Sequence, residues 1–136
     1  MSRILISINP EYVEKILNGT KKYEYRRMIA KKEVKSLIIY STCPVKKIVG
    51  EVKVVKTIEM APSSLWEKTK ETAGISRKKY REYFNGRKKA YAYVLGSVTK
   101  FEVGKSLTDI GIEKAPQSFL YLNQEQYDTL RKADDA

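Results

Sequence analysis

The sequence predicts an α+β fold, a small mixed β-barrel with flanking helices, built as one domain over residues 1–136. Six β-rich runs, mostly short, are separated by four helical segments without a regular strand–helix alternation. That order favours a mixed barrel over a doubly wound parallel sheet. The length of 136 residues fits one domain of common size, and a hydrophobic content of 42% can bury an ordinary core.

Local signals predict the first strand and the first helix. Residues 3–8 are β-rich and predict a strand. Asn9 can cap the helix that follows, Pro10 suits its first position, and Gly19 ends it. The apolar face of this helix has the expected spacing and consists of Val13, Ile16 and Leu17.

The later elements are predicted from the same periodicities and from caps. Residues 62–89 form a helical insertion with two short helices, the second capped by Ser76. Asn123 caps a last helix that ends near Lys132, and residues 133–136 are expected to fray. The remaining strands are expected at the motif after Gly19 and at residues 34–42, 46–58, 90–103 and 118–122.

The chain is strongly basic. Lys and Arg total 27 against 16 Asp and Glu, so the formal net charge is +11. This exceeds the ~2–8 charges that favour the solubility of a small domain. It indicates a polyanionic partner, because each neutralised phosphate releases condensed counterions. We expect RNA or another single-stranded nucleic acid, and a solvated basic surface without a specific partner is the alternative.

Residue types that are absent or rare disfavour several function classes. The chain has no histidine, the commonest metal ligand and general base, and its single cysteine is Cys43. An internal disulfide and a Cys-rich zinc site are therefore excluded, no metal or cofactor is expected, and Cys43 is expected to be a small packed residue. No apolar run approaches the ~20 residues of a membrane span, and no signal-peptide pattern is visible. We therefore expect a cytoplasmic protein with no membrane partner.

Three charged side chains follow the first helix within residues 19–26: Lys21, Glu24 and Arg26. Strands do not need such charges for pairing. Strand alternation points Glu24 and Arg26 to one side and Lys21 to the other, unless an irregular turn brings Lys21 round. One interpretation is a binding site in which Lys21 or Arg26 contacts a phosphate or a base edge. The other is a surface ion pair worth about 0–1 kcal/mol.

A second cationic cluster surrounds the second helix of the insertion. We expect its side chains to contact phosphates, while the aromatic residues between them face the core at i, i+3, i+4 spacing. These aromatics are Tyr80, Tyr83 and Phe84. Trp66 is also expected in the core, with a stacking wall for a base as the alternative. The expected phosphate contacts are Arg77, Lys78, Lys79, Arg81, Arg87, Lys88 and Lys89.

The pattern Gly-x-Lys-x-x-Glu-x-Arg at residues 19–26 resembles the signature of ASCH domains in the PUA-like superfamily. Segments 6–12, 39–50 and 115–119 carry the same resemblance, which spans residues 4–122. It implies a PUA-like barrel with a cleft between the sheet and the first helix, lined by the three charged motif residues. Related barrels, the YTH and EVE domains, take a single modified base into such a pocket. The insertion further resembles a subgroup described as transcription regulators.

The resemblance implies that two more segments lie near this cleft. Tyr40, Ser41 and Thr42 end the strand at 34–42 and would lie near the motif, where the two hydroxyls could bond a ligand. Ordinary turn chemistry ahead of Pro44 is the alternative. Gln117 and Ser118 would reach the cleft from the last strand.

Three interpretations of the function remain open. Charge and resemblance favour a nucleic-acid binding module, RNA more than DNA, that recognises a single flipped or modified base. The second is a small enzyme of the ASCH type, a nucleoside amidohydrolase or a ribonuclease, with Lys21 and Glu24 as catalytic candidates. The amidohydrolases carry a Thr three residues after the motif Lys, where this chain has Glu24, and no carboxylate cluster with metal spacing is visible. The third is a regulatory module that binds an acidic protein partner.

Overall fold

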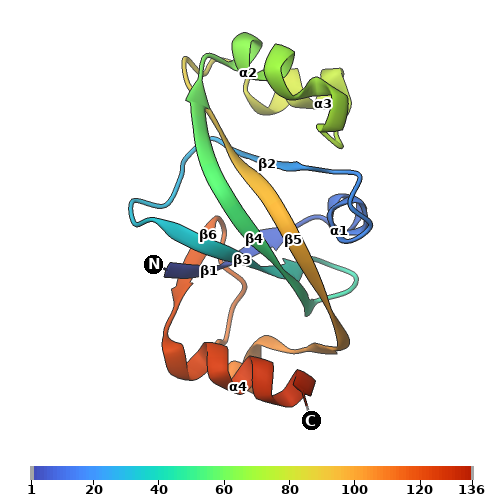
Figure 1. Cartoon of the computed structure of the whole chain (residues 1–136), viewed down its shortest axis with the longest axis vertical. Helices are drawn as coiled ribbons and strands as arrows, with labels where there is room; N and C mark the ends of the chain where they lie inside the picture. Colours follow the sequence, from blue (N-terminus) through green and yellow to red (C-terminus); the bar gives the residue numbers. More distant parts are fainter. Residues whose placement is uncertain (1, 136) are drawn as a thin grey trace.

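The computed structural model describes residues 2–135, with side chains described as far as Lys132. A mixed six-stranded sheet forms its centre (Figure 1). The strands are β1 (Ser2–Ile8), β2 (Tyr23–Arg26), β3 (Val34–Ser41), β4 (Lys47–Met60), β5 (Ala90–Lys105) and β6 (Phe119–Leu122). Their order in the sheet is β2-β5-β4-β3-β1-β6, with β1 and β3 parallel and the other neighbours antiparallel. The expected α+β class is confirmed, and the sheet stays open, with β2 and β6 as its edges.

Four α-helices flank the sheet in the order that the sequence predicts. They are α1 (Pro10–Leu17), α2 (Pro62–Thr69), α3 (Arg77–Tyr83) and α4 (Gln124–Asp135), with short 3₁₀ turns η1 (Lys70–Thr72) and η2 (Leu107–Ile110). The α4 backbone continues past the expected end near Lys132 to Asp135, and Ala136, the last residue of the expected frayed tail, lies outside the described residues. Among the described residues, no helix is long and apolar enough to cross a membrane.

The expected helix signals are confirmed. The Asn9 side chain accepts a hydrogen bond from the Glu11 N–H at 3.1 Å, and the Ser76 hydroxyl accepts from the Lys79 N–H, also at 3.1 Å. The Asn123 side chain caps α4 through the Gln126 N–H at 2.7 Å. Each cap satisfies a backbone donor that the first helical turn leaves without a partner.

Two long strands position the candidate site. β4 and β5 pair with each other far beyond the point where β4 leaves β3, and this extended ribbon carries β2 on its free edge. The helical insertion connects the far ends of the two strands, so α2 and α3 lie at one end of the molecule and α4 at the other (Figure 1). The arrangement places β2, α1 and the insertion around one corner of the sheet.

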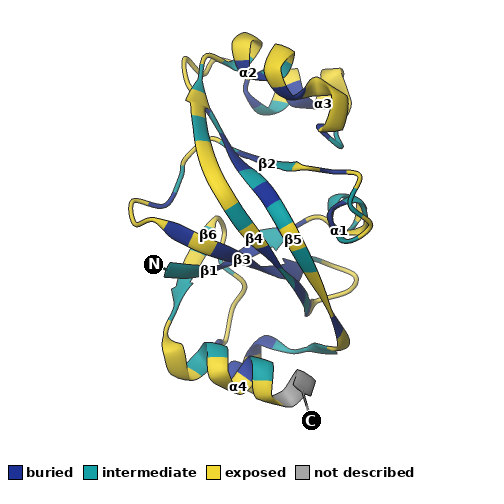
Figure 2. Cartoon of the chain, in the orientation of Figure 1, coloured by how far each residue is buried: buried dark blue, intermediate teal, exposed yellow. Residues whose placement is uncertain are grey.

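Three hydrophobic clusters hold these parts together. One packs α1 against the sheet through Val13 and Ile16, and a second packs η2 and α4 on the other side through Leu107 and Leu130. A third joins the insertion to β2 and β5 (Figure 2, where buried residues are dark blue). Its members include Tyr25, Leu65, Tyr80, Phe84 and Ala92.

The structure differs from two expectations about packing, one on the aromatic residues of the insertion and one on Cys43. Tyr80 and Phe84 are buried as expected, but Tyr83 and Trp66 are only half-buried against the third cluster. Cys43, expected to be packed, is exposed. Cys43 is exposed because it follows the end of β3, in the surface turn that leads to β4.

Candidate functional site

A cavity of about 200 Å³ lies between α1, β2 and the helical insertion, and we call it the motif pocket. It is lined by all three charged residues of the motif, Lys21, Glu24 and Arg26. Lys21 lies three residues before Glu24, so strand alternation alone would point it to the opposite face. An irregular turn before β2 brings Lys21 round: the Lys21 N–H donates back to the Lys15 carbonyl of α1 at 2.9 Å, and the Lys22 N–H donates to the Thr72 carbonyl of the insertion at 2.9 Å. The remaining lining residues are Ser7, Ile8, Asn9, Tyr12, Tyr25, Ile75 and Tyr83.

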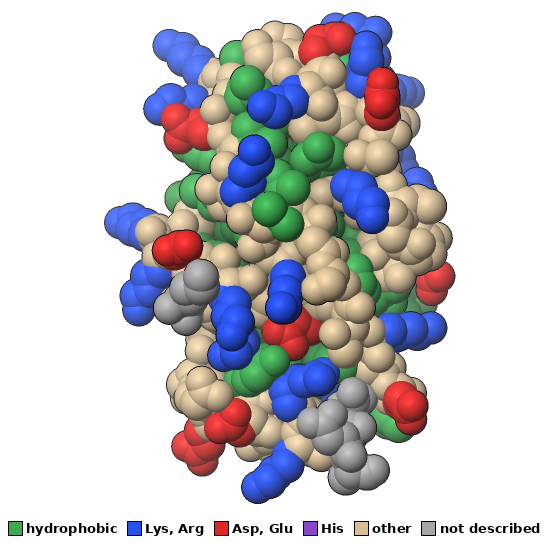
Figure 3. Space-filling view, in the orientation of Figure 1, with side chains coloured by type: hydrophobic (Ala, Val, Ile, Leu, Met, Phe, Trp, Pro, Cys, Tyr) green, Lys and Arg blue, Asp and Glu red, His purple; other side chains and the backbone are tan. Residues whose placement is uncertain are grey.

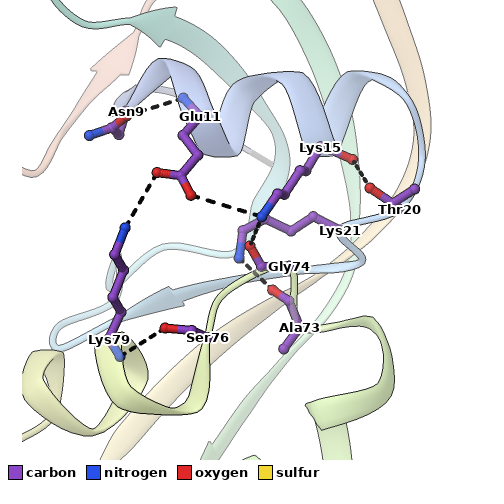
Figure 4. A network of polar contacts seen from close by, with 9 residues as sticks. All are labelled: Asn9, Glu11, Lys15, Thr20, Lys21, Ala73, Gly74, Ser76 and Lys79. Atoms are coloured by element: carbon purple, nitrogen blue, oxygen red, sulfur yellow. Dashed lines mark hydrogen bonds and ion pairs between the residues drawn. The ribbon is translucent and has the colours of Figure 1, made fainter.

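Lys21 is buried, with 3% of its surface exposed. Its Nζ donates to the Ala73 carbonyl at 2.7 Å (Figure 4) and lies 4.9 Å from the centre of the Tyr25 ring and 5.4 Å from that of Tyr12. Burial lowers the pKa of Lys21 to about 8, and the nearby Glu24 carboxylate opposes that shift. The fold therefore holds an ammonium whose proton is unusually labile near neutral pH.

Glu24 and Arg26 form a tight pair on the same wall. Arg26 donates from Nε at 3.1 Å and from Nη2 at 2.8 Å, both to Glu24 Oε2, and Nη2 also donates to the Ser7 carbonyl at 2.8 Å. Glu24 is only 6% exposed, so this is not the solvent-exposed ion pair of the alternative interpretation. Within the described chain, Glu24 Oε1 accepts no hydrogen bond and remains available as an acceptor.

The pocket thus combines aromatic walls with donors and an acceptor. Tyr12, Tyr25 and Tyr83 provide ring surfaces, and Lys21 keeps two N–H groups beyond the one that bonds Ala73. Such a set suits a planar ring that offers both donors and acceptors at its edge, because ring faces stack and ring edges bond. Burial raises the pKa of Tyr25 to about 12, so its hydroxyl stays neutral and bonds Thr69 at 2.6 Å.

The insertion closes one side of the motif pocket and is fastened to α1 (Figure 4). Lys15 donates to the Gly74 carbonyl at 3.4 Å, and Lys79 of α3 pairs with Glu11 at 3.4 Å. Gly74 has a φ of +68°, and a Cβ there would lie 2.5 Å from Lys21 Cβ and Cγ. Glycine is therefore required for the close approach of the insertion to Lys21.

The segments at Tyr40–Thr42 and at 117–118 do not line the motif pocket. The Tyr40 ring packs in the cluster with Leu5 and Ile38, on the opposite face of the sheet, because side chains alternate along β3. Ser41 is buried beside Ile8, and the Thr42 N–H donates to the Ile8 carbonyl at 3.0 Å, so both lie behind the pocket wall. Gln117 and Ser118 are exposed and follow Pro116, whose carbonyl accepts from the Ser7 hydroxyl at 2.8 Å.

The seven cationic residues in and just after α3 that were expected to contact phosphates are all exposed. They do not form one patch: Arg77 and Arg81 line a second cavity, Lys79 pairs with Glu11, and Lys89 pairs with Glu59 at 3.6 Å. Figure 3 shows Lys and Arg side chains over the whole of one face, with hydrophobic side chains between them in its upper half. Within residues 2–132, no group of three or more acidic or cysteine side chains is placed to hold a metal ion.

Sequence reasoning missed the aromatic walls and the Ala73 carbonyl. Tyr25 lies inside the motif, and its position between Glu24 and Arg26 could have indicated that its ring also lines the pocket. Tyr12 lies beside the apolar stripe of α1, and Tyr83 was expected in the core. The contact of Lys21 with Ala73 joins residues 52 positions apart, and no local pattern predicts it.

Comparisons with known proteins find matches to both the sequence and the fold. A family model for the ASCH domain matches residues 6–102. A protein from Zymomonas mobilis named ASCH domain-containing ribonuclease is 35% identical over 92 residues, 67% of this chain and 62% of that protein. A crystal structure of ASCH from Zymomonas mobilis shares 28% identity with a TM-score of 0.90, covering 96% of this chain and 94% of that one.

A longer relative shows that the same sequence pattern occurs as part of a larger protein. A Ureaplasma parvum protein named ATP synthase subunit alpha is 33% identical over 120 residues, which are 88% of this chain and 15% of that protein. The chain therefore spans less than two thirds of either of these two sequence relatives. The match therefore does not show that this chain has the activity of either full-length protein.

Proposed function

Because this chain belongs to the ASCH domain family, we propose that it is an RNA-binding module that takes a single flipped or modified base into the motif pocket. The observation that carries the proposal is the wall of an aromatic cavity that holds the buried Lys21 and Glu24 beside the half-buried Arg26. A cavity of about 200 Å³ is smaller than the ~300–1,000 Å³ typical of drug-sized ligands, so one base fits the proposal better than several nucleotides.

Each wall of the pocket has a role in this proposal. The base lies between tyrosine rings, and stacking is favourable for every base because every base has a π-face. Lys21 donates to an acceptor on the base edge, and Glu24 Oε1 accepts from an exocyclic amine. Arg26 keeps Glu24 oriented through its two bonds to Oε2.

The basic surface supplies attraction that does not depend on sequence. The net charge of +11 and the exposed cations of the insertion draw the phosphate backbone to this end of the molecule. Arg27 adds a cation at the rim, with its guanidinium 4.5 Å from the centre of the Tyr83 ring. The pocket then selects the base, and the surface sets the affinity.

A second candidate function is RNA cleavage, and one observation favours it: a relative 35% identical to this chain is named a ribonuclease. Lys21 and Glu24 are the groups for such chemistry here, since the pKa of about 8 would let Lys21 exchange a proton near neutral pH. The geometry supports binding better, because Glu24 and Lys21 are both engaged by neighbours.

The test compares two lysine variants that lose the same charge. Lys21→Met removes the buried ammonium but keeps an unbranched side chain, and Lys22→Met removes an exposed neighbour outside the pocket. We expect Lys21→Met to weaken binding of a labelled single-stranded RNA about tenfold or more, the effect of losing one charge-assisted hydrogen bond. Fluorescence anisotropy measures the affinity, and thermal unfolding checks that both variants fold. Equal affinities for the two variants would exclude the motif pocket as the RNA site.

The same RNA separates binding from cleavage. Wild-type protein is incubated with the RNA and with acylated nucleosides, with and without added divalent metal, and the products are resolved by chromatography. We expect intact substrate. Turnover that Glu24→Gln abolishes would establish an enzyme instead, with Glu24 in its machinery.

A further inference from the structure

A second cavity, of about 330 Å³, lies within the helical insertion between α2 and α3. Its floor is aromatic, with the half-buried Trp66 beside the buried Tyr80 and Phe84. Arg77 and Arg81 stand at its rim, both exposed. The expected function of RNA binding through the motif pocket does not use this cavity.

Helix α3 separates the two cavities and presents a different face to each. Residues 77, 80, 81 and 84 share one face by i, i+3, i+4, i+7 spacing, and all four line the second cavity. Tyr83, on another face, lines the motif pocket. Aromatic packing beneath α3 connects the walls of the two cavities: the centre of the buried Tyr80 ring lies 5.0 Å from that of Tyr25 and 4.8 Å from that of Trp66.

The polar groups of the second cavity favour an anion. Among the described residues, Arg77 and Arg81 form no ion pair, in contrast to Lys79 and Lys89 on the same insertion. Glu67, the acid of this cavity, is held by Lys70 at 2.8 Å. Two guanidinium groups one helical turn apart, in a cavity that an indole also lines, match a phosphate joined to a flat ring.

We propose that this cavity is a second nucleotide subsite of the RNA surface, in which a neighbouring base stacks on Trp66 and its phosphate is held by Arg77 and Arg81. The inference rests on the proposed function, because both subsites take nucleotides of one strand. The strand crosses α3, so the two subsites together read two bases, one on each side of the helix. An acidic peptide fits less well, since a carboxylate side chain leaves the aromatic floor uncovered.

Trp66 makes the test direct, because it is the single tryptophan of the chain. A single-stranded RNA of about eight nucleotides, within the range of single-strand binding sites, is titrated into the wild-type protein. Tryptophan fluorescence and the anisotropy of a label on the RNA are followed together. We expect the fluorescence of Trp66 to be quenched in parallel with the rise in anisotropy. Saturating RNA quenches Trp66 in the Lys21→Met variant as well.

A charge-matched pair of double variants provides the control. Arg77→Gln/Arg81→Gln and Lys78→Gln/Lys88→Gln remove the same charge from the same surface, but only the first pair lines the cavity. At about 0.3 M salt, where diffuse attraction is screened, we expect the arginine variant to bind RNA about tenfold more weakly than the lysine variant. Trp66→Leu is expected to lose about tenfold in affinity through lost stacking, and Trp66→Phe less.

The outcomes separate the two proposals. A rise in anisotropy without quenching, together with equal affinities of the two double variants, overturns the second subsite and leaves the motif pocket standing. Absence of any anisotropy change in the wild type overturns both. Quenching by a polyglutamate peptide at the same concentrations as by RNA also overturns the inference, because it assigns the cavity to an acidic protein.

Discussion

Lys21 is a charged side chain that folding removes almost completely from water. Burial lowers its pKa to about 8, below the ~10.4 of a free lysine, so between these values the unfolded chain binds more protons than the native one. Stability therefore rises with pH across that window, because the cost of burying the ammonium disappears as Lys21 loses its proton. Ala73 and two tyrosine rings reduce this cost without cancelling it.

The titration of Lys21 predicts opposite pH trends for binding and stability. From about pH 7 to about pH 9 we expect RNA affinity to fall, because the neutral amine no longer attracts an acceptor, while the free energy of unfolding rises by up to roughly 3 kcal/mol toward pH 10. Anisotropy and urea unfolding across this range measure the two trends. In Lys21→Met, the contribution of Lys21 to the pH dependence of RNA affinity and of stability should be absent. A wild-type affinity that does not change with pH either would contradict the assignment of Lys21 to the RNA site.

At the level of secondary structure, the insertion is the element that turns a motif into a pocket. β2 carries Glu24 and Arg26, and Ile75 and Tyr83 of the insertion provide the opposite wall. The Ala73 carbonyl of the insertion accepts the hydrogen bond that holds Lys21. The approach is close because Gly74 has no side chain where Lys21 passes. A side chain at position 74 should therefore disturb the site even though Gly74 does not line the pocket.

Two glycines with similar backbone geometry allow a controlled test. Gly74 and Gly86 have φ values of +68° and +76°, so alanine at either costs about 1 kcal/mol of backbone strain. A Cβ on Gly74 meets Lys21, whereas nothing lies within 4 Å of one on Gly86. We expect Gly74→Ala to lower the free energy of unfolding by about 1–3 kcal/mol more than Gly86→Ala. It should also weaken RNA binding, because Lys21 must move.

Equal stability and equal affinity of the two glycine variants would mean that the insertion can withdraw from Lys21 at no cost. The pocket wall would then be adaptable, and the proposed recognition of a single base would lose its geometric support. Chemical denaturation and anisotropy decide between these outcomes.

For the whole molecule, Lys and Arg side chains are spread over the surface, and the fold determines which of them lie near the two cavities. The β4–β5 ribbon carries the insertion to the end of the molecule opposite α4 (Figure 1). The cations of the insertion therefore stand close to the second cavity and to the wall of the motif pocket that the insertion provides. Two of these cations, Lys79 and Lys89, already pair with acids, which reduces their attraction for phosphate. Lys78 and Lys88 have no such partner among the described residues.

Salt dependence tests the role of this surface. Changing Lys78, Lys79, Lys88 and Lys89 to Gln should make the slope of log affinity against log salt shallower, by about 0.7 for each phosphate no longer contacted by the protein. Because two of the four are paired, we expect a change of about 1–2 units. Anisotropy titrations at several salt concentrations measure the slope. An unchanged slope would show that these four lysines face only solvent.

Local chemistry was sufficient to predict much of this protein. The caps at Asn9, Ser76 and Asn123 and the order of strands and helices depend on neighbours a few residues apart, which the sequence displays directly. The charged motif was equally visible, since three ionic side chains after a helix end are not explained by strand pairing. Net charge, too, is a property of composition alone.

Contacts between distant segments were decided only by the tertiary structure. The sequence could not predict that Ala73 would meet Lys21, that the Tyr40 ring would pack on the far face of the sheet, or that the sheet would stay open. It also left open which cations of the insertion line a cavity, Arg77 and Arg81. The physical reason is that burial and pocket shape depend on which surfaces the chain brings together, and a periodic pattern specifies a face without specifying what covers it.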